Sequence, residues 1–325
     1  MRKKHKQQNV LTYMVGIVLA MVVILGSALL FIGSTDEKKS ITLGHRDHIA
    51  YTPLYVALEQ GYFEQEGLVV KQATFETTNQ MVAAVVSGHV DAVLGGANLE
   101  TIYSIEEKFP NTLQIFTTLD VTEETGVTCV MVKAGSSIQS MTEITGMRAA
   151  TLPGTFSPLW VNAALNTVNM SIENIILQSI TPGLQLGALE SEQIEILFTV
   201  EPVCTFGVNT GVGNIIYNEP LRHLGSSVTA SIMSASLAEN NPEIAQKIVM
   251  INDKAIDFIR NNPEEAIAIM TKYTGYRQNL TVGMKAPSYS KSTEVNSERL
   301  QELADRLHAE EALDTVLNVR GILYN

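Results

Sequence analysis

Cysteine is nearly absent from this chain of 325 residues. Only Cys129 and Cys204 occur, with no C-x-x-C pair and no zinc-type spacing, which excludes a metal–thiolate site. Both lie among apolar, strand-like residues, so we expect buried free thiols, although export would permit a disulfide between them. Because no cysteine precedes position 129, a lipid anchor on an N-terminal cysteine is disfavoured.

Basic residues are also scarce. The chain has 22 Lys and Arg against 34 Asp and Glu, a formal net charge of -12. Four of the basic residues, Arg2, Lys3, Lys4 and Lys6, belong to the N-terminal tip. The acidic remainder would repel nucleic acid, so no nucleic-acid partner is expected. A solubilising acidic surface accounts for this composition without any further function.

Catalytic and metal-binding motifs are missing as well. No G-x-S-x-G elbow occurs and the histidines are scattered, so a Ser/His/Asp hydrolase has no support. The stretch GVNTGVG, residues 207–213, lacks the Lys-Ser or Lys-Thr of a phosphate loop, and we interpret it as a turn. His45, Asp47 and His48 fit no strong metal-site spacing. We therefore predict no catalytic residue, no metal and no cofactor.

One long hydrophobic run is present, uncharged from Val10 to Gly33. At about 1.5 Å rise per residue, a helix of this length spans a bilayer. Basic residues before the run and Asp36 and Glu37 after it place the rest of the chain outside the cytoplasm. We predict that residues 1–33 form a cytoplasmic tip followed by a single-pass membrane anchor. Cleavage as a signal peptide, which would release the protein, stays open, although such peptides have shorter apolar cores and a small-x-small site.

Beyond residue 40, short apolar strands alternate with helical patterns, which is typical of β-α-β units around a mainly parallel sheet. One series runs from a strand at residues 41–44 to another at 113–119, and a second series runs from Arg148 to Val200. Amphipathic helices follow from Pro242 onward and need a sheet to cover.

The predicted fold is therefore α/β with two lobes. Residues 34–40 form a linker, residues 41–126 and 228–325 a discontinuous first lobe, residues 134–222 a second lobe, and residues 127–133 and 223–227 crossover hinges. Pro53, Pro242 and Pro263 suit the first turns of helices. Gly275 can end the last of these helices, and Trp160 is expected in the core.

Four stretches resemble one family of known proteins. PLYVALEQGYFEQEGLVV, residues 53–70, and SGHVDAVLGG, residues 87–96, resemble the opening of the periplasmic solute-binding proteins for nitrate, sulfonate, taurine and thiamine precursors. MTEITGMRAATLPGTFSPLW, residues 141–160, resembles that family's entry to the second lobe, and FTVEP, residues 198–202, its Glu-Pro exit. The resemblance covers nearly all residues after 40.

This resemblance implies a type II periplasmic-binding-protein-like fold and a role in an ABC importer. Such a protein captures a small organic or anionic solute outside the cytoplasm and delivers it to the permease subunits without catalysis. Two departures from the family pattern, at residues 143–146 and 194–196, keep the resemblance from naming the ligand.

Two other functions remain as alternatives. A same-fold enzyme that makes the thiamine pyrimidine precursor also resembles this group, but it carries a cysteine-rich iron motif that two isolated cysteines do not match. A ligand-sensing receptor module would explain an anchor in front of a binding domain. The few polar residues before the anchor leave no room for an effector domain.

The candidate binding residues lie at predicted strand ends. In open parallel sheets, ligands bind beyond the carboxyl ends of the strands, where helix N-termini also attract anionic groups. Three turns have this position, at residues 45–52, 95–98 and 153–157, and Glu201 ends a fourth strand. The predicted ligand contacts are His48, Tyr51, Gly95, Ala97, Asn98, Thr155, Phe156, Ser157 and Glu201.

Each side chain suggests a role and a structural alternative. The hydroxyls of Thr155 and Ser157 could donate to a ligand or simply cap a helix, and the rings of Tyr51 and Phe156 could stack on one. Glu201 could accept from an amine, a pyrimidine or a hydroxyl, or fix a hinge. An acidic floor argues against a nitrate-like anion.

Overall fold

The computed structural model describes residues 39–121 and 127–324, and residues from Ser40 onward form one compact unit. The apolar run at residues 10–33, predicted as a membrane anchor, lies outside the described residues. Within them, no helix has the length and apolar character needed to cross a membrane.

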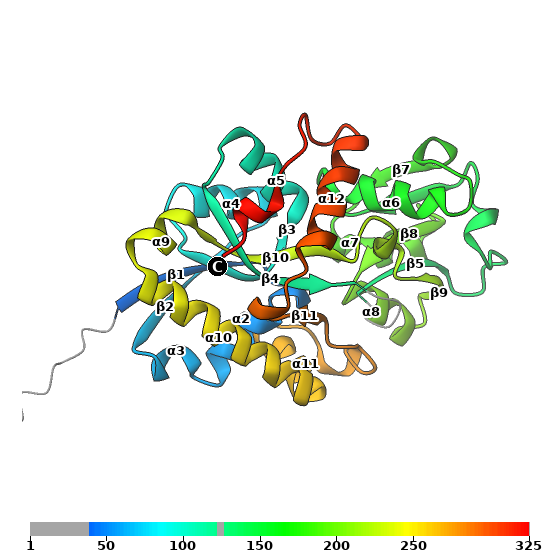
Figure 1. Ribbon diagram of the computed structural model, residues 1–325. Helices are drawn as coiled ribbons and strands as arrows, with labels where there is room; N and C mark the ends of the chain where they lie inside the picture. The colour runs from blue at the N-terminus through cyan, green and yellow to red at the C-terminus, as the bar shows by residue number, and fades with distance from the viewer. Residues whose placement is uncertain (1–38, 122–126, 325) are drawn as a thin grey trace, which may run out of the picture. The chain divides into compact units, whose positions relative to one another are not determined.

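Two mixed sheets organise the chain (Figure 1). The six-stranded sheet has the order β11-β4-β10-β3-β1-β2. Its strands are β1 (Lys39–His45), β2 (Leu68–Thr74), β3 (Ala92–Asn98), β4 (Leu113–Asp120), β10 (Ser227–Ser234) and β11 (Ser288–Ser290). β1 runs parallel to β3, whereas β10 runs antiparallel to both β3 and β4.

The five-stranded sheet has the order β7-β6-β8-β5-β9. It consists of β5 (Thr128–Lys133), β6 (Arg148–Thr151), β7 (Ile176–Ser179), β8 (Ile196–Val200) and β9 (Gly213–Asn218). β6 is parallel to β7 and β8, and β5 is antiparallel to β8 and β9.

The expectation of mainly parallel sheets is therefore wrong for two central strands, β5 and β10. Parallel neighbours need a crossover connection, usually a helix, that returns the chain to the same edge of the sheet. β5 and β10 each follow a strand of the other sheet without an α-helix between, so this requirement does not apply to them. Consequently most of the segment predicted as a hinge, residues 127–133, is a paired central strand.

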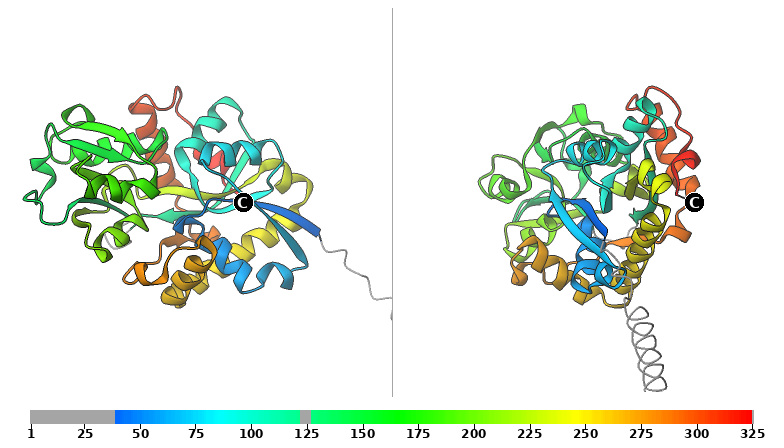
Figure 2. Two further views of the ribbon diagram at one scale, coloured as in Figure 1. Left: turned by 180° about the vertical axis from the view of Figure 1, so that it is seen from behind. Right: turned by 90° about the vertical axis from the view of Figure 1, so that its left-hand side faces the viewer.

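Helices cover both sheets (Figures 1 and 2). Those that contact the six-stranded sheet or its helices are η1 (Ile49–Tyr51), α2 (Thr52–Glu59), α3 (Tyr62–Gln65), α4 (Thr78–Val86), α5 (Leu99–Lys108), α9 (Ala235–Asn240), α10 (Pro242–Asn261), α11 (Pro263–Thr274) and α12 (Ser297–Ala309). The five-stranded sheet is covered by α6 (Phe156–Asn166), α7 (Pro182–Glu190) and α8 (Val203–Asn209). Short 3-10 turns η2 to η7 join several of these elements.

Sequence signals at the helix ends are confirmed. Pro53, Pro242 and Pro263 each lie in the first turn of their helices, where the missing N–H costs nothing. Gly275 follows α11 with φ 69°, a left-handed conformation that glycine adopts without strain. Trp160 is buried, as predicted, and its ring meets that of Phe198 at 6.1 Å.

The two cysteines form a disulfide, so the expectation of free thiols is wrong. Cys129 on β5 and Cys204 on α8 have Cα atoms 6.1 Å apart, within the range that a disulfide bridges. Their apolar neighbours correctly indicated burial. Pairing depends on α8 packing over β5, a contact between residues 75 positions apart, which local sequence does not show.

Candidate ligand-binding site

Residues from the two sheets meet at the carboxyl ends of their strands. The Thr155 hydroxyl, at the start of α6, donates to Glu100 Oε1, in the first turn of α5, at 3.1 Å. On another side, the Asn209 amide of α8 donates to the carbonyl oxygens of Leu280 at 3.0 Å and Val282 at 2.9 Å. The predicted turns at residues 95–98 and 153–157 thus lie next to each other.

The loop after β1 is tightly folded around the predicted contact His48. Its Nδ1 accepts from the Ala50 N–H at 3.2 Å. Burial and, to a smaller extent, the nearby positive charge of Arg46 lower the pKa of His48 to about 3, although a hydrogen bond with the backbone of Glu201 acts to raise it. His48 is therefore neutral at physiological pH and contacts the second sheet's strand end.

Tyr51 lies in the core of the six-stranded half, where its side chain is 1% exposed. Its hydroxyl donates to the Gly96 carbonyl at 3.1 Å, and burial raises its pKa. In this conformation the ring is enclosed by protein, and its role as a ligand contact stays a prediction.

Gly95 and Gly96 are required by this packing. A Cβ on Gly95 would lie 2.0 Å from the Ala50 carbonyl oxygen, and one on Gly96 would lie 2.3 Å from the Tyr51 ring. Both residues also have positive φ, 93° and 51°, which favours glycine. The predicted contacts Gly95 and Ala97 are buried, so this turn can offer a ligand little besides backbone.

Asn98 ends β3 and is half-buried. It occupies the N-cap position of α5, but its side chain makes no capping hydrogen bond. On the neighbouring strand β10, Thr229 lies opposite Asn98. The buried hydroxyl of Thr229 has no hydrogen-bond partner among the described residues.

The turn after β6 contains three predicted contacts that differ in exposure. Thr155 is exposed and bonded to Glu100, whereas Phe156 is half-buried against the core. Ser157 is buried within α6. Gly154 has φ 118°, a backbone angle that favours glycine.

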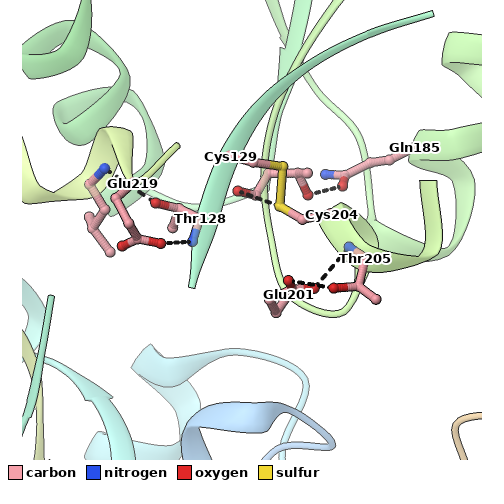
Figure 3. Close-up of a disulfide and its surroundings, with 9 residues drawn as sticks. Thr128, Cys129, Gln185, Glu201, Cys204, Thr205 and Glu219 are labelled. Atoms are coloured by element: carbon pink, nitrogen blue, oxygen red, sulfur yellow. Dashed lines mark hydrogen bonds between the residues drawn. A yellow bond between two sulfur atoms is a disulfide. The ribbon is translucent and has the colours of Figure 1, made fainter. Parts of the chain in front are cut away.

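Glu201 is the most distinctive of the predicted contacts. Its side chain is 5% exposed, and its two carboxylate oxygens accept from Thr205, from the N–H at 3.0 Å and from the hydroxyl at 2.7 Å (Figure 3). Burial and, to a smaller extent, the nearby charge of Glu219 raise its pKa to about 7, although the hydrogen bonds from Thr205 act to lower it. Glu201 is thus a buried acid that titrates near neutrality.

Glu201 borders a cavity of about 330 Å³. The other polar residues around it include Thr205, Asn209, Asn218 and Lys285, and the Cys129–Cys204 disulfide forms part of its wall. Sequence reasoning missed these residues because they come from α8, β9 and the segment before β11, and only Thr205 is near a recognised motif.

A larger groove, of about 450 Å³, runs along α12 and η7 (Val319–Ile322). Its lining includes Glu298, Glu302 and Asp305, and no predicted contact contributes to it. Among the described residues, no group of three or more His, Cys, Asp or Glu side chains is arranged to hold a metal ion.

A family model described as NMT1/THI5 like matches residues 48–266. The chain belongs to the NMT1/THI5-like family. The family prediction from sequence motifs is therefore confirmed. All nine predicted contacts, from His48 to Glu201, fall within the matched range. No curated protein sequence matches the chain significantly.

Solved structures share the fold of this NMT1/THI5-like chain. The periplasmic aliphatic sulphonate binding protein SsuA from Escherichia coli has a TM-score of 0.72 and 15% identity, over 88% of this chain and 92% of its own. The alkanesulfonate-binding protein SsuA from Xanthomonas axonopodis pv. citri, bound to MOPS, has a TM-score of 0.72 and 15% identity, over 89% of this chain and 99% of its own. The desulfurization enzyme DszB has a TM-score of 0.67 and 12% identity, over 88% of this chain and 96% of its own. The predicted two-sheet α/β fold of periplasmic binding proteins is thus confirmed.

Proposed function

We propose that this NMT1/THI5-like chain is the extracytoplasmic solute-binding component of an ABC importer. It would bind a small molecule where the two sheets meet and release it unchanged to the permease. The SsuA neighbours, which are binding proteins, support this function as an analogy of fold. The nine residues from His48 to Glu201 remain proposed contacts.

Buried polar atoms at the strand ends carry this proposal. Of the five buried side-chain atoms without a hydrogen-bond partner in the described part of the chain, three are His45 Nδ1, Thr151 Oγ1 and Thr229 Oγ1. They belong to the last residue of β1, the last residue of β6 and the residue paired with the end of β3. Unsatisfied buried groups are costly, and a polar molecule that reached these strand ends would offer the three atoms hydrogen-bond partners.

A same-fold enzyme is the second candidate, since DszB is an enzyme of this fold. The disulfide argues against the cysteine-rich iron motif of the thiamine-pyrimidine enzymes, because both cysteines of the chain are engaged in it. The binding function is therefore the better supported of the two.

Retention of a metabolite tests the binding function. Purified protein dialysed against a bacterial metabolite extract should retain one small molecule per chain, as counted by native mass spectrometry. After release the molecule should have its original mass. A product of altered mass would favour the enzyme, and a chain that retains nothing would contradict the binding function.

The location proposed for this domain is outside the cytoplasm, tethered by residues 10–33, with the ABC permease as partner. The apolar run and the basic residues before it support the tether, and cleavage as a signal peptide remains the alternative. Full-length protein should fractionate with membranes, and a chain beginning at Ser34 should be soluble. A native protein that is free and begins after Ser34 would contradict the anchor.

A further inference from the structure

The carboxylate of Glu201 can accept further hydrogen bonds. Its carboxylate borders the 330 Å³ cavity and is 5% exposed. Thr205 donates one hydrogen bond to each of its oxygens, and a carboxylate oxygen has two lone pairs. Each oxygen therefore keeps acceptor capacity, and an ionised carboxylate has no hydrogen to donate.

The charged groups around Glu201 favour a donor there. Glu219, whose Oε1 accepts from the Thr128 N–H at 2.6 Å, adds a second buried negative charge. His48 is neutral because its pKa falls to about 3. The charge of Arg46 contributes to this shift of His48 but is not among the charges that shift the pKa of Glu201. Lys285 borders the same cavity, but it is exposed, so water and salt screen its charge.

A second carboxylate, that of Glu100, lies where a ligand oxyanion would be expected to bind, at the start of a helix. Helix N-termini attract oxyanions, and α5 and α6 begin next to each other. Glu100, 8% exposed, lies in the first turn of α5 and accepts from Thr155 at the start of α6. A ligand oxyanion at this junction would meet a buried carboxylate of the protein.

We infer that the ligand presents a hydrogen-bond donor to Glu201, such as an amine, an amidine, an amino group or a hydroxyl, and that sulfonates and similar oxyanions are excluded. This inference rests on the proposed binding function. It makes Glu100 and Glu201 specificity-determining residues and separates this chain from the two SsuA proteins, which their names describe as sulfonate-binding.

Two probes of equal ring size and opposite charge test the inference, benzamidinium and benzenesulfonate. Calorimetric titration at pH 6, 7 and 8 should show binding of benzamidinium alone. Its affinity should rise about tenfold from pH 6 to pH 8, because a donor binds the ionised form of Glu201. An oxyanion would show the opposite trend.

Variants separate Glu201 from other titrating groups. Glu201→Gln should weaken benzamidinium binding about tenfold or more at pH 8 and should remove the pH trend. Glu239→Gln removes the same charge from an exposed position on α9, so affinity and trend should stay as in the wild type. The histidines are present in both variants.

Preferential binding of benzenesulfonate, or affinity that rises as the pH falls, would overturn the inference and leave the binding function standing. The compound retained from the metabolite extract goes through the same pH series and variants. The inference can therefore be tested even when the natural ligand resembles neither benzamidinium nor benzenesulfonate. If the extract and both probes show no binding, the proposed function and this inference fail together.

Discussion

The two sheets supply different kinds of group to the candidate site. From the six-stranded sheet come Tyr51, Gly95 and Ala97, all buried and held by their own core. From the five-stranded sheet come Thr155 and Glu201, polar groups that border the other half or a cavity. The first three residues form a packed wall whose shape is set by backbone, whereas the side chains proposed to distinguish ligands come from both halves, Glu100 from α5 and Glu201 from the position after β8.

This difference has a physical cause. Interiors packed to crystal-like density tolerate little change in shape, so the wall contributes precise geometry and little adaptable chemistry. In the other half, Glu201 is buried with both of its carboxylate oxygens hydrogen-bonded to Thr205. Substitutions should therefore lower stability under all conditions on the first side, and on the other side they should change how stability depends on pH or on reductant.

The largest effect is expected in the wall, from Gly95→Ala. The new Cβ would lie 2.0 Å from the Ala50 carbonyl oxygen, a backbone atom that cannot rotate away, at φ 93°. We expect a loss of about 4 kcal/mol or more in the free energy of unfolding, measured by urea titration. Gly88→Ala is the matched control, because Gly88 has φ 75° but open space around it. It should lose only about 1–2 kcal/mol, and equal losses would contradict the steric explanation.

The disulfide should account for the next largest effect, confined to the five-stranded half. It closes a loop of 75 residues, for which chain entropy predicts a stabilisation of about 4 kcal/mol. Replacing both Cys129 and Cys204 by Ala should lower the melting temperature, as reduction does in the wild type. The double variant should not respond to reductant. A wild type indifferent to complete reduction would show that burial alone holds α8 on β5.

Glu201 should make stability depend on pH near neutrality. Its pKa rises from 4.5 to about 7 on folding, so the folded state holds its proton longer than the unfolded chain. Wild-type stability should therefore fall by about 3 kcal/mol, relative to Glu201→Gln, as the pH rises from 4 through 8. Urea titrations at each pH measure this difference.

Glu195 offers a control of opposite sign. It is exposed, and hydrogen bonds from the Arg148 backbone and side chain lower its pKa. Glu195→Gln should therefore remove a small stabilisation that is present above the unfolded pKa and is lost as the pH falls. If the free energy of unfolding of Glu201→Gln does not rise relative to the wild type between pH 4 and pH 8, folding does not raise the pKa of Glu201.

The smallest effect is expected where the two halves touch, between Glu100 and Thr155. Glu100→Met and Thr155→Val should each cost about 0.5–1.5 kcal/mol, and together less than the sum, because each removes the same hydrogen bond. Small-angle scattering of the ligand-free double variant should show a larger radius of gyration. Strict additivity with an unchanged radius would mean that this bond does not join the halves.

Local signals in the sequence determined the elements and the family. Proline in the first helical turn, glycine after a helix, and the alternation of apolar strands with helices act over a few residues, so Pro242, Gly275 and Trp160 were predicted correctly. Glu201 was recognised as a candidate from the strand and proline around it. These features depend on backbone conformation and hydrophobic pattern, which neighbouring residues largely set.

Tertiary structure decided the features that join distant residues. The burial of Tyr51 follows from packing against Gly96, and the disulfide follows from α8 lying on β5. β5 and β10 run antiparallel to their neighbours because the chain passes directly between two sheets. The cavity at Glu201 is likewise built from residues as far apart as Thr128 and Lys285. A local pattern cannot specify such contacts, because their energies depend on which surfaces the whole fold brings together.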